Sequence, residues 1–146
     1  MTKVTKKVLV FGVFDLLHPG HKWFLRQAKK FGDRLYVIVA RDCNAYKQKK
    51  HYPQQTERIR RQALAKLTYV TKAQLGARDI NRRYEAVIKL NPSIIALGYD
   101  QRYLTTVLKR DLKNLKLKTK VVRLSAWRPE LYKTSRLRSA SSNRLT

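Results

Sequence analysis

The sequence is poor in the residues that build disulfides and membrane spans. It has one cysteine among 146 residues, and a single cysteine cannot form a disulfide framework, which predicts a chain that works in the reducing cytoplasm. It has no run of about 18 apolar residues, the length that a membrane-spanning helix needs. The first residues, MTKVTKKVLVFG, lead straight into a strand pattern, so no signal peptide and no membrane role are expected.

Acidic residues are scarce as well. The chain has 9 Asp and Glu against 34 Lys and Arg, which gives a formal net charge of +25. This balance favours polyanion partners, speeds association with phosphorylated ligands and makes nonspecific nucleic-acid binding salt-dependent. The basic residues are spread along the chain rather than gathered in one arm. A solvated lysine-rich surface therefore remains an equal alternative to a polyanion-binding role.

The rest of the composition is that of one compact domain. With 43% hydrophobic residues, residues 1–146 are expected to form one domain with a single core, and the polar end, 139–146, is expected to fray. Strand patterns alternate with helical patterns, which is typical of an α/β fold. Strands are predicted over residues 8–14, 34–40, 68–75, 93–98 and 120–124, and helices from residue 19 and over 56–66, 81–90 and 102–115. Residues 44–55 have neither period and are predicted to form a flexible basic loop.

The stretch VLVFGVFDLLHPGH, residues 8–21, joins the first predicted strand to the first predicted helix. Pro19 and Gly20 fit the first helical turn, where proline loses no hydrogen bond and glycine lets a ligand approach the backbone. We expect the N–H groups of that turn to face an anion above the carboxyl end of the strand. His18 and His21 then lie on one side of the same cavity. Imidazole donors there are suited to stabilising the charge that develops in nucleotidyl transfer.

The residues alone leave two other interpretations of the histidine pair open. A short HxxH motif occurs by chance, and it also fits a metal-binding pair or ordinary residues at a helix start. The metal interpretation is weakened because no glutamate completes an HExxH frame and Cys43 has no CxxC partner. No metal-binding residues are predicted.

Further motifs give the whole chain a resemblance to a known family. HPGH after a strand ending in GVFD is similar to the HxGH cytidylyltransferase-like nucleotidyltransferases. The other family motifs follow in order: VARDCN (39–44), KQKK (47–50), TER (56–58), LGYDQ (97–101) and RPELYKTSRL (128–137). HPGH, ARD with an asparagine, and LGYDQ resemble the archaeal-type FAD synthases, whereas KQKK resembles glycerol-3-phosphate cytidylyltransferase. The resemblance implies a Rossmann-like, doubly wound sheet of five parallel strands in the order 3-2-1-4-5.

The resemblance also implies roles for single residues. The histidines stabilise the transition state, the lysines and Arg58 neutralise phosphates, and the segment from Arg128 holds the leaving group. The implied catalytic residues are His18, His21, Lys47, Lys49 and Arg128. The implied nucleotide-binding residues are Val13, Phe14, Asp15, Gly20, Arg58, Gly98, Tyr99, Asp100, Thr134 and Ser135. Asp42 and Lys49 are implied in acceptor binding. Asp42 fits a loop-capping aspartate equally well, Asp15 is interpreted as a residue that orients the histidine turn, and Asp100 also fits the N-cap of the helix over 102–115.

The resulting expectation is a nucleotidyltransferase that moves AMP from ATP to FMN, with Mg²⁺ on the phosphates. A CTP-dependent enzyme that acts on glycerol 3-phosphate or a similar phosphorylated alcohol is the alternative. A basic nucleic-acid-binding module without turnover is a second alternative, which the charge of +25 favours. A flavin needs an apolar slot, for which Trp127, Tyr132 and Tyr103 are candidates. The resemblance also implies a possible homodimer.

Overall fold

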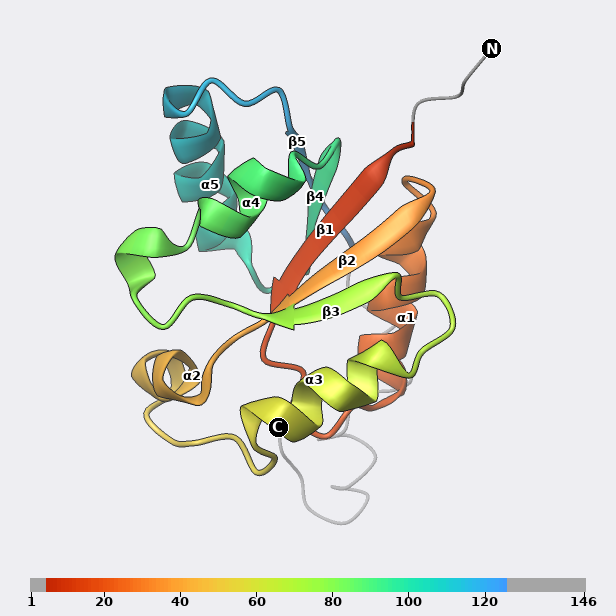
Figure 1. The fold of residues 1–146 in the computed structure, drawn as a ribbon, viewed down its shortest axis with the longest axis vertical. Helices are drawn as coiled ribbons and strands as arrows, with labels where there is room; N and C mark the ends of the chain where they lie inside the picture. Colours follow the sequence, from red (N-terminus) through yellow and green to blue (C-terminus); the bar gives the residue numbers. More distant parts are fainter. Residues whose placement is uncertain (1–4, 126–146) are drawn as a thin grey trace.

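Five short strands form a parallel sheet at the centre of the fold (Figure 1). The computed structural model describes residues 5–125. The strands are β1 (Lys7–Gly12), β2 (Arg34–Val39), β3 (Lys72–Leu75), β4 (Ile94–Leu97) and β5 (Lys120–Arg123). They pair in parallel in the order β3-β2-β1-β4-β5. The predicted α/β class and strand order are confirmed.

Helices pack against both faces of the sheet (Figure 1). They are α1 (Pro19–Lys29), α2 (Asp42–Lys49), α3 (Glu57–Ala65), the 3₁₀ helix η1 (Ile80–Arg82), α4 (Glu85–Leu90) and α5 (Arg102–Asn114). Leu25 of α1 and Leu64 of α3 belong to one buried apolar cluster. Val87 of α4 and Leu108 of α5 belong to a second cluster.

Strand β1 shows why its sequence is apolar without alternation. Val8 and Val10 lie in the first cluster and Leu9 lies in the second, and all three are fully buried. Because side chains alternate between the two faces of a strand, a strand covered on both faces is apolar at every position.

Helix α2 is the main departure from the predicted elements, because it occupies residues that were predicted to be a flexible loop. Only Ala45 of this helix is buried, so the sequence carries no apolar stripe that would reveal it. Polar contacts hold it instead. The carboxylates of Asp42 and Glu57 accept each other's backbone N–H, at 3.2 and 2.9 Å, which caps α2 and α3 reciprocally. Asn44 Nδ2 donates to the carbonyl of Ala77 at 2.9 Å.

Other element boundaries also differ from the prediction. Strand β1 ends at Gly12 rather than residue 14, and Phe14 has a left-handed backbone with φ 54°. Strand β3 begins at Lys72 rather than residue 68, because the chain turns between Leu64 and Val70 through two consecutive backbone hydrogen bonds. The helix predicted over 81–90 is divided into η1 and α4. Within residues 5–125, no helix has the length and apolar character needed to cross a bilayer.

The carboxyl ends of the parallel strands meet at one edge of the sheet. There lie the segment after β1, the helix α2 after β2, and residues 98–101 after β4. In open α/β sheets this edge is where ligands bind.

Candidate active site

The loop between β1 and α1 has an unusual backbone. Phe14 and Leu16 have φ values of 54° and 51°, a left-handed conformation that costs bulky residues about 1–2 kcal/mol each. A Cβ added to Gly12 would lie 2.6 Å from the Phe14 ring, so this glycine lets the ring fold back over the end of β1. Phe14 is buried, and its ring meets that of His21 edge to face, with centroids 5.5 Å apart. The strained loop thus positions His21.

His18 and His21 form a capping box at the start of α1. The Nδ1 atom of His18 accepts the backbone N–H groups of Gly20 at 3.1 Å and His21 at 3.4 Å, and His21 Nδ1 accepts the N–H of His18 at 3.4 Å. The two rings stack with centroids 3.7 Å apart. Each side chain therefore satisfies backbone donors of the helix start.

These contacts determine which ring nitrogens are protonated. A nitrogen that accepts an N–H carries no proton, so in the neutral form of each imidazole the proton lies on Nε2. Both Nε2–H groups are then donors that the capping box does not use. Two parallel imidazoles at the edge of the sheet thus offer neutral donors to an anion.

The charge state of the pair agrees with this geometry. Burial lowers the pKa of His18 below its ordinary value. The pKa of His21 is lowered to about 4, first by burial and then by the charges of His18 and Lys49, while the Asp15 carboxylate opposes the shift. Both rings are therefore neutral at pH 7.

The predicted role of the helix amides needs correction. The N–H groups of Gly20 and His21 were expected to face an anion directly, but they donate to His18 Nδ1, and the N–H of Lys22 donates to the His18 carbonyl at 3.1 Å. Pro19 has no N–H. The imidazole of His18 thus stands between the helix start and any anion and presents its own Nε2–H.

A second segment is bound to the loop between β1 and α1. The carboxylate of Asp15 accepts the backbone N–H groups of Gln54 at 2.8 Å and Gln55 at 3.0 Å. The side-chain oxygen of Gln55 accepts the N–H of Leu16 at 3.2 Å. Asp15 was predicted to contact the nucleotide, and here it holds residues 54 and 55 against the turn that carries the histidines.

Arg60 is the site residue that the sequence analysis missed. It is fully buried. Its guanidinium donates to the carbonyls of Val13 at 2.8 Å and Gln55 at 3.1 Å, and it pairs with Asp42 at 2.6 Å. The signal was present in the sequence, because Arg60 lies four residues before the buried Leu64 and so on the apolar face of α3.

Arg58, which was predicted to contact phosphates, lies two residues away on the exposed surface. The structure records no polar contact of its side chain within the described residues. Its predicted contact with the triphosphate stays a prediction. Asp42, predicted to bind the acceptor, is engaged with Arg60 and with the N–H of Glu57.

The two predicted lysines lie at the end of α2. Lys47 and Lys49 are both exposed, and the charge of Lys49 is close enough to lower the pKa of His21. Helix α2 therefore brings Lys49 to the side of the site formed by β2.

Arg41, which precedes the helix, pairs with Glu57 at 2.9 Å and donates to the Gly76 carbonyl. The hydrogen bond from the Asp42 N–H to the Glu57 carboxylate is the main cause that lowers the pKa of Glu57 below its ordinary value.

Residues 98–101 form the opposite side of the site. The N–H of Gly98 donates to the side chain of Gln101 at 2.8 Å, and a Cβ on Gly98 would lie 3.9 Å from Phe24 of α1. Tyr99 is 53% exposed and Asp100 is exposed. Gln101, not Asp100, occupies the N-cap position of α5, so the capping role that was considered for Asp100 is wrong.

Three predicted site residues, Arg128, Thr134 and Ser135, lie outside the described residues, as do the frayed end expected at 139–146 and the aromatic candidates Trp127 and Tyr132. The side chain of Tyr103 is not described either. Among residues 5–125, no group of three or more His, Cys, Asp and Glu side chains is placed to hold a metal ion.

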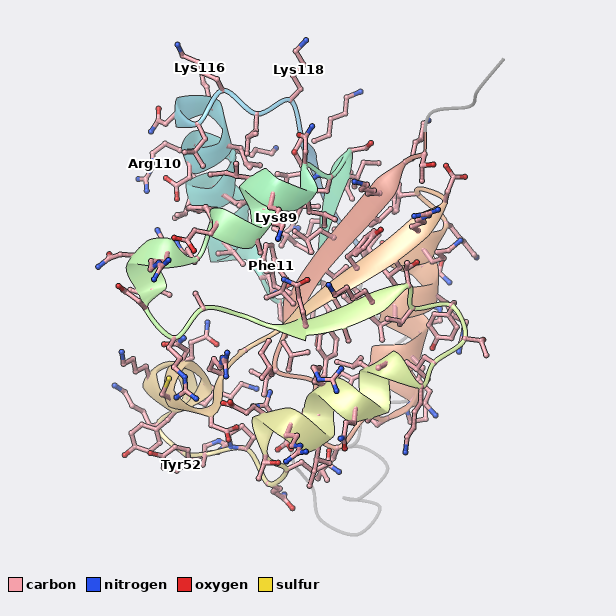
Figure 2. The ribbon with its side chains drawn as sticks, viewed as in Figure 1. Phe11, Tyr52, Lys89, Arg110, Lys116 and Lys118 are labelled. Carbon is pink, nitrogen blue, oxygen red and sulfur yellow. The ribbon has the colours of Figure 1, made fainter. Side chains whose placement is uncertain are left out.

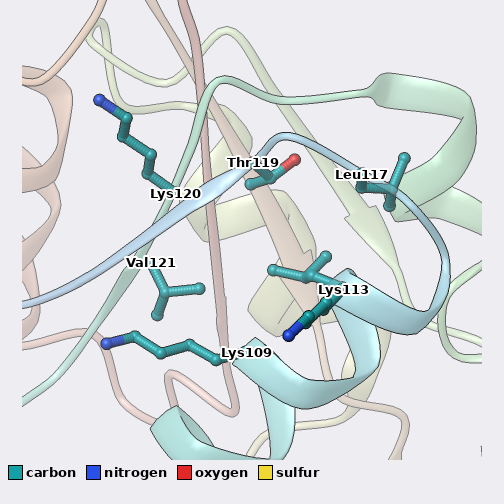
Figure 3. A pocket seen from close by; sticks show the side chains of 7 residues that line it. Lys109, Lys113, Leu117, Thr119, Lys120 and Val121 are labelled. Atoms are coloured by element: carbon teal, nitrogen blue, oxygen red, sulfur yellow. The ribbon is translucent and has the colours of Figure 1, made fainter.

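Two cavities lie away from this edge. One of about 380 Å³ lies between α5 and β5, where Lys109, Lys113 and Lys120 line it (Figure 3). One of about 360 Å³ lies at the amino ends of β1, β4 and β5. Lys116 and Lys118 extend from the same end of the molecule, whereas Tyr52 lies at the other end, below α2 (Figure 2). The cavities therefore belong to a separate basic surface.

Comparisons with known proteins show the family that the motifs resemble. The family model described as cytidylyltransferase-like matches residues 9–141. The chain is 43% identical over 121 residues to a FAD synthase of Aciduliprofundum boonei, covering 83% of this chain and 79% of that protein. It is 44% identical over 133 residues to a FAD synthase of Methanococcoides burtonii, covering 90% of both chains.

Solved structures confirm the fold. A Thermoplasma volcanium protein described as a lipopolysaccharide core biosynthesis protein superposes with a TM-score of 0.77 at 37% identity, covering 85% of this chain and 99% of that one. A pantoate-beta-alanine ligase of Francisella tularensis gives a TM-score of 0.63 at 17% identity, covering 96% of this chain and 70% of that one. The latter likeness concerns the fold alone.

Proposed function

The chain is a nucleotidyltransferase of the cytidylyltransferase-like family, and from that premise we propose that it makes FAD by transferring AMP from ATP to FMN. The similarity to archaeal FAD synthases over most of both chains is the observation that carries this proposal. The alternative with CTP and glycerol 3-phosphate is not favoured. Homodimer formation, polyanion binding and the cytoplasmic location stay predictions.

The proposed reaction is an in-line displacement at the α-phosphorus of ATP. An FMN phosphate oxygen forms the new P–O bond, the bond from the α-phosphorus to the oxygen bridging the β-phosphorus breaks, and pyrophosphate leaves with that electron pair. No general base is needed, because the FMN phosphate is ionised at pH 7. The Nε2–H groups of His18 and His21 donate to the oxygens on which negative charge develops.

Mg²⁺ enters this scheme as part of the substrate, bound to the ATP phosphates, where it offsets their charge. The described residues offer no dedicated metal cage. Both oxygens of Asp15, the carboxylate that influences His21, accept backbone N–H groups. Because the Asp15 oxygens are engaged, the groups beside the histidines that remain for a ligand are the Nε2–H donors and the Lys49 ammonium, which suit phosphates better than a resident metal.

The two sides of the site receive different substrates in this proposal. Gly98, Tyr99 and Asp100 lie along the nucleobase and ribose, and the acceptor phosphate lies on the α2 side, near Lys49. Lys47 and Arg58 approach the phosphates from exposed positions. Gly20 leaves room for a phosphate beside the histidines. Arg128, Thr134 and Ser135 are proposed to hold the leaving pyrophosphate.

Pyrophosphate release by the purified chain tests the function. We expect release, and chromatographically identified FAD, from ATP with FMN and Mg²⁺, and little from CTP with glycerol 3-phosphate. A variant carrying His18→Ala and His21→Ala, purified in parallel, controls for contaminating activity. Turnover with CTP and glycerol 3-phosphate alone would replace the proposed function with the alternative.

A further inference from the structure

Two aromatic side chains are exposed together beside the proposed acceptor side. Tyr46 of α2 is 43% exposed and Tyr52 is 64% exposed. Their rings are in contact, with centroids 4.6 Å apart and planes inclined by 32°. Aromatic side chains stabilise a protein mainly through the large area that they bury. A pair that leaves so much ring surface open is suited to receiving another planar group.

The local backbone explains how the two rings meet. Lys50 ends α2 in the left-handed conformation, with φ 65° and ψ 15°, and its N–H donates to the Tyr46 carbonyl at 2.7 Å. This C-terminal motif turns the chain back toward the last turn of the helix, where an apolar contact commonly follows. The motif accounts for the contact between the rings. It does not account for their exposure.

The pair is connected to the catalytic turn through the backbone. Tyr52 precedes Pro53, and the next two N–H groups, from Gln54 and Gln55, donate to the Asp15 carboxylate. Asp15 lies three residues before His18. Because residues 54 and 55 are held against the loop that carries the histidines, Tyr52 is held at the same edge of the sheet.

A cationic side chain of α2 lies near both the rings and the histidines. Lys49 is three residues after Tyr46, on the same side of α2, and it influences the pKa of His21. This side of the site therefore carries the imidazoles, an ammonium and the aromatic pair. A ligand that fits the last two has a phosphate joined by a short chain to a planar ring.

We propose that Tyr46 and Tyr52 form the subsite for the isoalloxazine ring of FMN, whose phosphate lies toward Lys49. The inference rests on the proposed function and extends it to the orientation of the acceptor. Glycerol 3-phosphate has no ring to occupy this surface. The adenine ring of ATP is placed on the β4 side, where Tyr99 is the exposed aromatic residue.

Steady-state kinetics of the full chain test the subsite. We expect Tyr52→Ala to raise the KM for FMN by about 10-fold, the loss of one ring-stacking contact, with kcat and the KM for ATP changed less than twofold. Tyr52→Phe keeps the ring and should retain the wild-type KM. Tyr99→Ala is the matched control, because it removes an equally exposed tyrosine and should raise the KM for ATP instead. An unchanged KM for FMN in Tyr52→Ala would overturn the subsite and leave the proposed function intact.

Binding without turnover separates the subsite from the proposed function. Stacking on tyrosine should quench flavin fluorescence, and we expect the wild type and Tyr52→Phe, but not Tyr52→Ala, to quench FMN and riboflavin. Lys49→Ala should weaken FMN binding and leave riboflavin binding unchanged, because riboflavin has no phosphate. Tyr52-dependent quenching in a chain that makes no FAD would support the subsite and refute the function. A wild type that quenches neither flavin would overturn the subsite.

Discussion

The two ring nitrogens of His18 have different partners, which separates its structural task from its chemical one. Nδ1 caps α1, and Nε2–H is the proposed donor to the reacting phosphate. Asparagine is an equally good N-cap and lacks the imidazole donor. We therefore expect His18→Asn to keep the free energy of unfolding within about 0.5 kcal/mol of wild type and to lower kcat by about 100-fold.

His18→Ala is the comparison for this prediction, because it removes the cap and the donor together. It should lose about 1 kcal/mol of stability in addition to the same loss of kcat. Urea denaturation and FAD synthesis measure the two effects separately. If His18→Asn retained wild-type kcat, the cap would be the whole role of His18.

The surroundings of His21 predict a specific titration. Its pKa of about 4 lies below the ordinary 6.5, so between these values the unfolded chain binds a proton that the folded chain does not. The contribution of His21 to the free energy of unfolding is fully present above pH 6.5. It falls as the pH drops toward 4, by at most about 1.4 kcal/mol per pH unit. NMR titration should show the pKa rising in Lys49→Ala and falling further in Asp15→Asn. An unchanged pKa in Lys49→Ala would place that lysine away from the site.

Arg60 and Arg58 differ by two positions in one helix and should differ strongly in effect. Arg60→Met leaves the carbonyls of Val13 and Gln55 and the carboxylate of Asp42 without their donor. We expect a loss of about 3 kcal/mol in the free energy of unfolding. Arg58→Ala, at an exposed position, should change it by less than about 0.5 kcal/mol. Equal urea midpoints for the two variants would contradict the structural role of Arg60.

Single residues also show why the sequence predicted only part of the site. The motif HPGH after an apolar strand identified the histidines, because local chemistry and spacing carry that signal. The pairing of Arg60 with Asp42 joins residues 18 positions apart, and the contacts of Asp15 span about 40 positions. Tertiary contacts of this kind leave no local pattern, apart from a charged residue on an apolar helix face.

At the scale of elements, apolar runs predicted β1, β2 and β4, since strands buried on both faces are apolar, whereas the pattern of the edge strand β3 only weakly alternates and β5 is half-buried at best. Helix α2 was not predicted, because tertiary polar contacts rather than an apolar stripe stabilise it. The sequence also could not show that the His18 side chain would accept hydrogen bonds from the first-turn N–H groups of α1. Serine, threonine, asparagine and aspartate are the usual caps, and a histidine in that position is not a recognised signal.

The backbone at the end of α2 is strained at one residue, and substitutions there can measure the strain. Lys50 adopts the left-handed conformation, which costs a residue with a Cβ about 1–2 kcal/mol, whereas glycine adopts it freely at a greater entropic cost of folding. We expect Lys50→Gly to raise the free energy of unfolding by up to about 1 kcal/mol. Lys50→Ala loses the same charge but keeps the Cβ, so it should give no gain. Equal thermal midpoints for the two variants would show that this turn is not strained.

At the scale of the whole molecule, lysines and arginines contribute to the excess positive charge in similar numbers. Every ion pair between described residues uses an arginine. Lys109, Lys113 and Lys120 line the cavity between α5 and β5 (Figure 3), near the amino end of β5, whereas the histidines follow the carboxyl end of β1. The predicted polyanion binding is therefore either concentrated on this basic surface or spread over all exposed lysines.

Two triple variants of equal net charge distinguish these possibilities. One changes Lys109, Lys113 and Lys120 to Gln, and the other changes the exposed Lys22, Lys66 and Lys72. If the α5–β5 surface binds duplex DNA, the first variant should reduce the slope of log K against log salt by roughly 2 to 3, since each phosphate contact contributes about 0.9. The second should leave the slope unchanged, and both should retain FAD synthesis. Equal reductions would show that binding follows net charge, and no measurable binding by the wild type would leave the lysines as a solvated surface.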